Sequence, residues 1–475
     1  MSDAVVDNPS ALKNPTDFYE HKAQLMHFLG MNTFSKDLLE FGHNQGWDPG
    51  PYITLVNTPA WKNRWENILD MLEEYNLDVL PYYEYAGTIG PSGLGPQQRA
   101  HPLNDNLPDF DYTHISWTED VNADLTDPDT YEDLKKIFER TIIMHKEKVN
   151  FTGAWIRPRS SELPVSFADN TLERFRIEAN DNIAVTRDQL KNDTPLYDKY
   201  ISWWLGKRKD FLFAMRDYLI DNGIYDAKVL YTADHTESGK THYDWEFNKN
   251  IVTDNPAAFK NLSFKYPVFD LNDLVQDDWH LEALLLPENT WENWEWNHAA
   301  PAPDPDNYKN DEGVLMTYTF NKAYTVNSKT AFERFRNEKD LAIIRHYCLN
   351  EDGMEGMGYF VTDVDWHGPF TMLAEARAMA NGDPRYIGYL SGSAFNKGSV
   401  QYVREFNANF LALPALPSEI IEGAANDPEV VVRKIETNSD SIYLAIINTG
   451  LEDKTDVKIS LPVKGDVFNA KMENF

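Results

Sequence analysis

Short apolar runs alternate with longer amphipathic segments along most of the chain. Runs of strand length, most of them dominated by apolar residues, occur at 31–35, 78–85, 151–157, 228–234, 281–286, 314–320, 341–349 and 357–363. Nearly continuous apolar runs of this length are typical of strands buried on both faces, as in parallel sheets. The pattern therefore predicts about eight strands of a parallel sheet.

The segments between these runs have apolar residues at helical spacing. In Trp61–Tyr75, for example, Trp65, Ile68 and Leu72 fall on one helix face. Strands that alternate with amphipathic helices favour an α/β fold, and we predict a (β/α)8 TIM barrel. The other predicted helices are Phe18–Gly30, Asp129–Lys146, Tyr200–Asn222, Lys329–Arg336, Phe370–Ala380 and Ser399–Leu411.

The pattern changes near the C-terminus. Residues 430–463 contain the alternating runs VVVRKIE, SIYLAIINTG and DVKISLP, with turn residues at Asn438-Ser439 and Asn448–Gly450. We therefore predict a barrel domain over 1–415 and a small antiparallel β domain over 416–475. Because the first predicted element is a helix, the strand count leaves open an earlier strand in an N-terminal portion that precedes this chain.

Composition narrows the classes of partner. The 475 residues include 76 acidic and 44 basic side chains, a net charge of −32, which disfavours nucleic acids and anionic membranes. No apolar run approaches the roughly 18–20 residues that cross a bilayer, and the start shows no basic-then-apolar signal peptide. Cys348 is the single cysteine, so no disulfide forms within the chain. The oligomeric state is left undetermined.

Carboxylates at strand ends are the candidate chemistry. In parallel barrels, catalytic groups lie where strands end at the carboxyl face, and hydrolysis of a glycosidic bond needs two carboxyl groups. Glu351 follows the run 341–349, and Glu237 follows the run 228–234. Glu162, after the run 151–157, is the rival of Glu237, because one additional early strand would make 151–157 the fourth strand. We therefore predict Glu237 and Glu351 as the catalytic pair, with Glu162 as the third candidate.

Other polar and aromatic residues lie at the same strand ends or in the Trp-rich segment 287–307. Aromatic rings can stack on sugars, and arginine can bind hydroxyl, sulfate or carboxylate groups. Pairing with structural carboxylates is the alternative role of the arginines, and loop packing is that of the tryptophans. The predicted substrate-binding residues are Glu84, Trp155, Arg157, Asp234, His235, Trp291, Trp294, Arg345, His346, Asp363, Trp366 and His367.

Metal and cofactor chemistry have little support in the sequence. The pairs Asp234-His235 and Asp365-x-His367 lack convincing ligand spacing. The glycine-rich segment 87–99 lacks the Lys-Ser/Thr ending of a phosphate-binding loop. We therefore predict neither a metal nor a cofactor, and a carbohydrate as the partner.

Several longer stretches are distinctive: LDVLPYYEYAG, FTGAWIRPRSSELPVSFADNTLERF, LYTADHTESG and GYFVTDVDWHGPF. Together they resemble TIM-barrel (clan A-like) glycoside hydrolases of marine polysaccharide-degrading bacteria, over most of residues 18–450. The resemblance implies an acid/base glutamate after strand four, a nucleophilic glutamate after strand seven and a retaining mechanism. The Asn-Glu pair typical of that clan is absent, since Ser161-Glu162 and Thr236-Glu237 stand in its place.

The same resemblance implies a red-algal galactan of the agar or carrageenan type as the substrate, and a periplasmic or secreted location, with a cytoplasmic one open. Family members are longer at the amino terminus. A non-catalytic carbohydrate-binding barrel, a β-galactosidase-like exo-enzyme, and a barrel hydrolase or lyase that uses Asp and His are the alternatives that the sequence leaves open.

Overall fold

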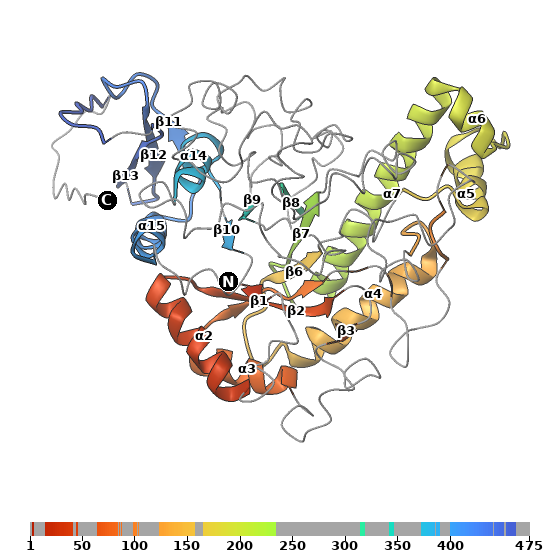
Figure 1. Cartoon of the computed structure of the whole chain (residues 1–475), viewed down its shortest axis with the longest axis horizontal. Coiled ribbons are helices and arrows are strands. Elements are labelled where there is room, and N and C mark those ends of the chain that lie inside the picture. Colours follow the sequence, from red (N-terminus) through yellow and green to blue (C-terminus); the bar gives the residue numbers. More distant parts are fainter. Residues whose placement is uncertain are drawn as a thin grey trace, which may run out of the picture.

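The computed structural model of the chain is drawn in Figure 1. It describes residues 2–3, 15–40, 44–45, 64–83, 85, 87, 98–101, 103, 123–156, 165–233, 314–318, 342–345, 372–384, 386–389, 400–439, 441–450 and 453–461. No helix in these ranges is long and apolar enough to span a bilayer.

A parallel sheet organises the first two thirds of the chain. Its strand order is β1-β2-β5-β6-β7-β8, and every neighbouring pair in this order is parallel. Short β4 (Asp78–Val79) pairs parallel with β2, and β3 (Asn44–Gln45) pairs antiparallel with it. The remaining strands are β1 (Ser2–Asp3), β2 (Thr33–Glu40), β5 (Tyr82–Tyr83), β6 (Gly153–Ile156), β7 (Lys228–Ala233) and β8 (Val314–Tyr318).

Two further parallel strands extend this series. The strands β9 (Ala342–Arg345) and β10 (Tyr386–Tyr389) pair with each other, and β9 lies beside β8. Among the residues that the structure describes, no ladder joins β8 to β9 or β10 to β1. The parallel α/β prediction is confirmed, and a closed barrel stays a prediction.

The strand count differs from the one that the sequence suggested. The prediction that the chain opens with a helix is wrong, because β1 precedes the first helix and pairs with β2. The run 78–85 is a single strand position interrupted at Pro81, which has no N–H for a ladder. Counted from β1, β6 is therefore the fourth parallel strand, β7 the fifth and β9 the seventh.

The last parallel strand is also new. The sequence pattern placed the eighth strand at 357–363 and another at 281–286, and both runs lie outside the described residues. The segment 386–389, YIGY, had no predicted strand, yet it pairs in register with β9 from Tyr386 opposite Ala342 to Tyr389 opposite Arg345.

Most predicted helices are confirmed. They are α2 (Pro15–Leu29), α3 (Arg64–Glu74), α4 (Pro128–Thr141) with the 3₁₀ turn Ile143–His145, α7 (Thr194–Asp221), α14 (Leu373–Gly382) and α15 (Val400–Ala412). The helices α5 (Asp169–Ala179) and α6 (Arg187–Asn192) were not predicted, because few of their residues are apolar. The helix predicted at 329–336 lies outside the described residues.

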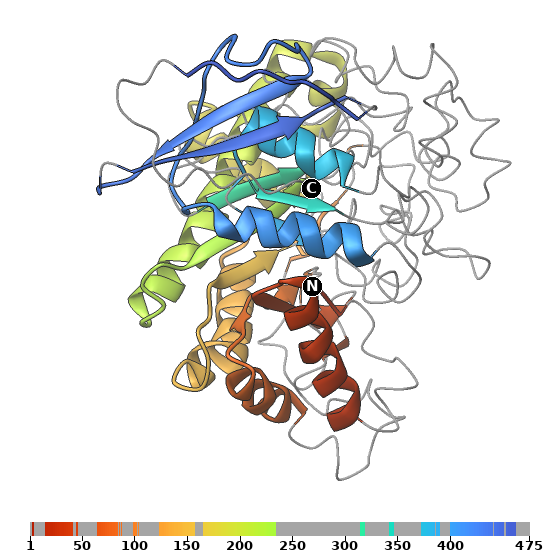
Figure 2. The same cartoon turned by 90° about the vertical axis from the view of Figure 1, so that its left-hand side faces the viewer.

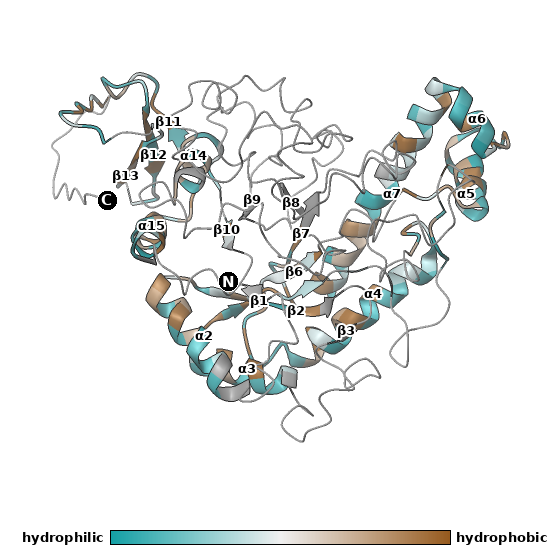
Figure 3. Cartoon of the chain, in the orientation of Figure 1, coloured by the Kyte–Doolittle hydropathy of each residue, from teal (hydrophilic) through white to brown (hydrophobic). Residues whose placement is uncertain are grey.

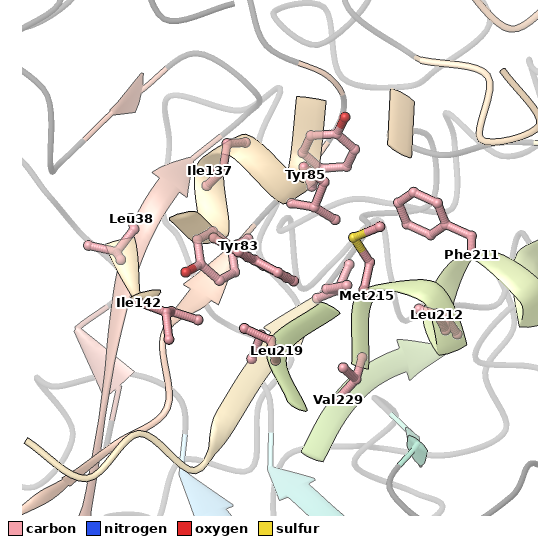
Figure 4. Close-up of a cluster of buried hydrophobic side chains, with 14 of the residues drawn as sticks. Leu38, Tyr83, Tyr85, Ile137, Ile142, Phe211, Leu212, Met215, Leu219 and Val229 are labelled. Atoms are coloured by element: carbon pink, nitrogen blue, oxygen red, sulfur yellow. The ribbon is translucent and has the colours of Figure 1, made fainter. Parts of the chain in front are cut away.

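The main core lies between the sheet and its helices. Leu38 of β2, Tyr83 of β5 and Val229 of β7 pack against side chains of α4 and α7, including Met215 and Leu219 (Figure 4). The same helices alternate between apolar and polar residues along the ribbon (Figure 3). Burying such an apolar stripe contributes roughly 25 cal/mol per Å² of apolar surface, which is why these short strands hold together.

Gly153 lies where β6 and β7 approach each other closely. Its φ is +140°, and a Cβ built there would lie 1.8 Å from the Lys228 carbonyl oxygen of β7. We expect Gly153→Ala to lower the free energy of unfolding by about 2–4 kcal/mol, because the β6–β7 ladder must separate and the backbone is strained. Urea unfolding would measure this. Gly206→Ala, on a helix with nothing within 4 Å of the added carbon, is the matched control.

A three-stranded antiparallel sheet follows α15. It contains β11 (Glu419–Ile420), β12 (Val430–Glu436) and β13 (Ile442–Asn448), in that order. The prediction that DVKISLP supplies the third strand is wrong for its described part, 456–461, which makes an isolated bridge through Ile459 to Ala425. The edge position is taken by β11 instead.

This antiparallel sheet packs on α14 (Figure 2). Two buried arginines link them: Arg433 donates to the Ala380 carbonyl at 2.7 Å, and Arg377 donates to the Thr449 carbonyl at 3.1 Å. Burial lowers the pKa of Arg377 to about 10, with Glu429 opposing the shift. The boundary at 415/416 stays a prediction, although the sheet shares a core with a helix before that boundary.

Candidate active site

The carboxyl ends of the central strands meet at one edge of the sheet. Tyr83 of β5 pairs with Ile156 of β6, which pairs with Tyr231 of β7, which in turn pairs with Met316 of β8. The segments that carry the candidate residues leave from this edge, since Glu84, Arg157 and Asp234 directly follow β5, β6 and β7 in the sequence. This edge is therefore the candidate active site.

Few of the predicted site residues lie in the described ranges. Trp155 lies in β6, and the backbone of Arg345 ends β9, where it pairs with Tyr389. The predicted residues that lie outside the described residues are Glu84, Arg157, Glu162, Asp234, His235, Glu237, Trp291, Trp294, His346, Glu351, Asp363, Trp366 and His367. For these, the structure defines the strand that each one follows or precedes.

Trp155 faces away from the helix layer. It is 3% exposed, and its ring lies 4.7 Å from that of Tyr82 at 53°. Leu230 of β7 completes this cluster, and Leu80 and Tyr386 pack against it. Trp155 therefore packs as a core residue here, and its predicted stacking on a sugar stays a prediction.

The contact of Tyr386 with this cluster bears on the shape of the sheet. Tyr386 belongs to β10, whereas Tyr82, Trp155 and Leu230 belong to β5, β6 and β7. A flat sheet would separate β10 from β6 by several strand spacings of about 4.8 Å each. The sheet must therefore curve so that the inner faces of distant strands meet, which is the curvature that a barrel requires.

A buried polar cluster links the segments that follow β5 and β6. Its centre is Asp124, which is fully buried. One carboxylate oxygen accepts from the backbone N–H and the hydroxyl of Thr126, at 2.8 and 2.7 Å. The other oxygen accepts from Gln98 Nε2 at 2.8 Å and from the Thr171 hydroxyl. These partners come from segments on both sides of β6.

Arg174 of α5 adds a positive charge to this cluster. Its guanidinium donates to Gln98 at 3.2 Å and to Thr126 at 3.1 Å, and it pairs with Asp127 at 3.3 Å. The Gln98 backbone N–H also donates to Asp127, at 2.8 Å. The segments 98–101, 123–127 and 165–174 are thus held as one hydrogen-bonded unit.

Residues 166–168 are held by further bonds. The Tyr200 hydroxyl donates to the Ser166 carbonyl, and Arg187 donates to the Phe167 carbonyl at 2.9 Å. The Phe167 backbone N–H donates to the His101 carbonyl at 2.7 Å, and the Phe167 ring stacks on Tyr200 at 5.1 Å. The chain that leaves the fourth strand is therefore fixed again within ten residues.

Tyr85 fixes the other neighbouring segment. Its hydroxyl donates to Asp133 of α4, with oxygens 2.9 Å apart. Burial raises the pKa of Tyr85 well above its usual value, and the charge of Asp133 raises it further. Tyr85 is therefore a neutral donor at ordinary pH, which anchors the residue after Glu84 to the helix layer.

Sequence patterns did not predict the role of Asp124. In a chain with 76 acidic residues, an aspartate just before a helix is usually a solvated loop residue. The single signal is its spacing before Thr126 and Pro128, which is typical of a polar turn that precedes a helix. The described residues contain no group of three or more His, Cys, Asp or Glu side chains arranged to hold a metal ion.

Comparison with known proteins gives weak similarities. No protein-family model matches the chain, and no curated protein matches it. Among solved structures, the PgaB (BpsB) glycoside hydrolase domain from Bordetella bronchiseptica is similar over 81% of this chain and 91% of its own, at TM-score 0.45 and 8% identity.

Two other solved structures are similar at a comparable level. A β-galactosidase from Marinomonas ef1 covers 84% of this chain, which spans 59% of that protein, at TM-score 0.45 and 11% identity. The catalytic domain of a β-amylase from Paenibacillus polymyxa covers 84% of this chain and 96% of its own, at TM-score 0.39 and 10% identity. Likenesses of this size leave the function to be argued from the residues of the chain itself.

Proposed function

We propose that the chain is a retaining glycoside hydrolase that cleaves O-glycosidic bonds of a polysaccharide or oligosaccharide. The observation that carries the proposal is the strand order. With β1 first, Glu162 follows the fourth parallel strand and Glu351 follows the seventh. These are the two positions that the resemblance to barrel glycosidases gives to the acid/base and the nucleophile.

The same strand order favours Glu162 over Glu237. Glu237 follows β7, which is the fifth strand once β1 is counted. Glu162 is three residues from Val165, which is buried, so chain length alone keeps their Cα atoms within about 11 Å. The residues that flank its segment, Ile156 and Val165, are both buried.

In the proposed reaction, Glu162 protonates the leaving-group oxygen while Glu351 attacks the anomeric carbon. The glycosyl–enzyme ester forms as the glycosidic bond breaks, and Glu162 then takes a proton from the water that cleaves the ester. This mechanism requires the two carboxyl groups to lie roughly 5–5.5 Å apart. The chemistry needs neither a metal nor an organic cofactor.

We propose a red-algal galactan of the agar or carrageenan type as the substrate. The sequence motifs support this class, and arginines at strand ends, Arg157 and Arg345, suit sulfated or carboxylated sugars. A polymer of this kind is met outside the cytoplasm, which supports a periplasmic or secreted location.

The test is hydrolysis by the purified chain of a glycan panel that contains agarose, porphyran, carrageenans and plant galactans, with products identified by mass spectrometry. We expect cleavage of a red-algal galactan, with the anomeric configuration retained in the first product seen by NMR. Cleavage of plant glycans alone would refute the substrate class. If the chain binds a glycan but cleaves none, the glycoside hydrolase proposal is refuted and a non-catalytic carbohydrate-binding barrel is favoured.

A further inference from the structure

The buried carboxylate of Asp124 is an unusual centre for a loop cluster. It is fully buried, and in the described part of the chain the groups that donate to its oxygens are all neutral. A carboxylate removed from water is costly unless its oxygens are hydrogen-bonded, and here each oxygen accepts two bonds. The donors Gln98, Thr126 and Thr171 must therefore stay in place together.

Thr171 connects this carboxylate to the chain after the fourth strand. A hydroxyl has one hydrogen, and Thr171 donates it to Asp124, so Ser166 must be the donor in the 3.1 Å bond between the Ser166 and Thr171 hydroxyls. The Ser166 oxygen in turn accepts from the backbone N–H groups of Ala168 at 3.3 Å and His101 at 3.4 Å. The position of the carboxylate is thus transmitted to residues 166–168.

We propose that Asp124 and Thr171 form a positioning pair that sets where the chain between β6 and α5 lies. This inference rests on the proposed function, because that chain carries Glu162. Asp124 and Thr171 need not touch the substrate. They hold residues 166–168 and thereby limit the positions that the carboxyl of Glu162, four to six residues earlier, can take. A misplacement of a catalytic group by about 1 Å costs as much as 10²-fold in rate.

The test compares two substitutions of Thr171. Thr171→Val keeps the shape and removes the hydroxyl, whereas Thr171→Ser keeps the hydroxyl. We expect Thr171→Val to lower kcat about 10–100-fold with KM changed less than about threefold, and Thr171→Ser to stay within about threefold of the wild type. The pH at which the basic limb of the kcat/KM profile falls should also shift in Thr171→Val, because the acid is held differently.

Thr141→Val is the matched structural control. Thr141 is also fully buried, and its hydroxyl bonds the Ile137 carbonyl and the Tyr83 hydroxyl, both at 2.7 Å, on the helix side of the sheet. We expect Thr141→Val to lower the melting temperature as Thr171→Val does, with kcat unchanged. If Thr171→Val loses stability but keeps the wild-type kcat and pH profile, the pair is merely structural and the proposal is overturned.

A second measurement separates this inference from the proposed function. Amide hydrogen exchange of the peptide that spans 157–170 needs no substrate, and we expect about tenfold faster exchange in Thr171→Val than in Thr171→Ser or Thr141→Val. Equal exchange in all three variants overturns the positioning pair whatever the wild type hydrolyses. If exchange is faster in Thr171→Val but the wild type hydrolyses no glycan, the positioning pair stands and the glycosidase proposal is refuted. The catalytic part of this inference is then refuted as well.

Discussion

Glu351→Gln is expected to lower kcat on the preferred galactan by about 10⁴-fold or more, while the melting temperature stays near that of the wild type. The amide is nearly the same size as the carboxylate but cannot attack the anomeric carbon. Without the nucleophile, no glycosyl–enzyme ester forms, and the single-displacement route lacks a placed base. Reducing-sugar release measured over hours, together with thermal unfolding, would give both quantities.

Asp352→Asn is the control, because it removes one negative charge at the adjacent position of the same segment. We expect it to keep kcat within about tenfold of the wild type. A second check uses Glu351→Ala with sodium azide. Azide can occupy the space of the lost carboxylate and attack the anomeric carbon, which gives a glycosyl azide of inverted configuration as the leaving group departs. Full activity of Glu351→Gln would eliminate this residue as the nucleophile.

Glu162→Gln should lower kcat/KM on the galactan by about 10²–10⁴-fold, the range expected for loss of a general acid. With a dinitrophenyl glycoside as the substrate, we expect the glycosylation rate of Glu162→Gln to be close to that of the wild type. Dinitrophenolate leaves without protonation, so this step does not need the acid. The basic limb of the pH profile should also disappear, since it reports deprotonation of the acid. Burst kinetics on the activated glycoside would separate glycosylation from the slow hydrolysis of the ester.

Glu237→Gln is the matched comparison, since it makes the same chemical change after the next strand. With β7 as the fifth strand, we expect kcat/KM within about tenfold of the wild type. The reverse result, a large loss in Glu237→Gln and none in Glu162→Gln, would show that the strand count from β1 is a poor guide to the acid. It would return Glu237 to that role.

The strands that the sequence predicted well are those whose burial is continuous. GAWI of β6 is recognisable because all four of its residues are buried, so its apolar residues follow one another. β1 is different, since Ser2–Asp3 has no apolar residue at all. Only the pairing of Ser2 with Ser35 and of Asp3 with Lys36 makes it a strand, and no local pattern encodes a partner that lies more than thirty residues away.

The helices α5 and α6 were also missed by the sequence pattern, although both are local elements. The buried residues of α5 are Thr171, Leu172 and Phe175, which is too narrow an apolar stripe to predict a helix. Thr171 in its first turn is buried, and its hydroxyl bonds Asp124, a residue 47 positions earlier. A polar side chain can be buried when a hydrogen-bond partner satisfies it. Hydropathy nevertheless predicts that such a side chain is exposed, because it considers the residue alone.

By itself, the sequence determined the alternation of strands and helices, the positions of most helices and the glutamates that follow strands, because local periodicity records which residues are buried. Tertiary structure alone decided the order of the strands. The pairing of β1 with β2 moved the run 151–157 to the fourth position and so favoured Glu162 over Glu237. It also placed Asp124 beside Thr171, because long-range hydrogen bonds, unlike hydrophobic periodicity, leave no regular pattern in the chain.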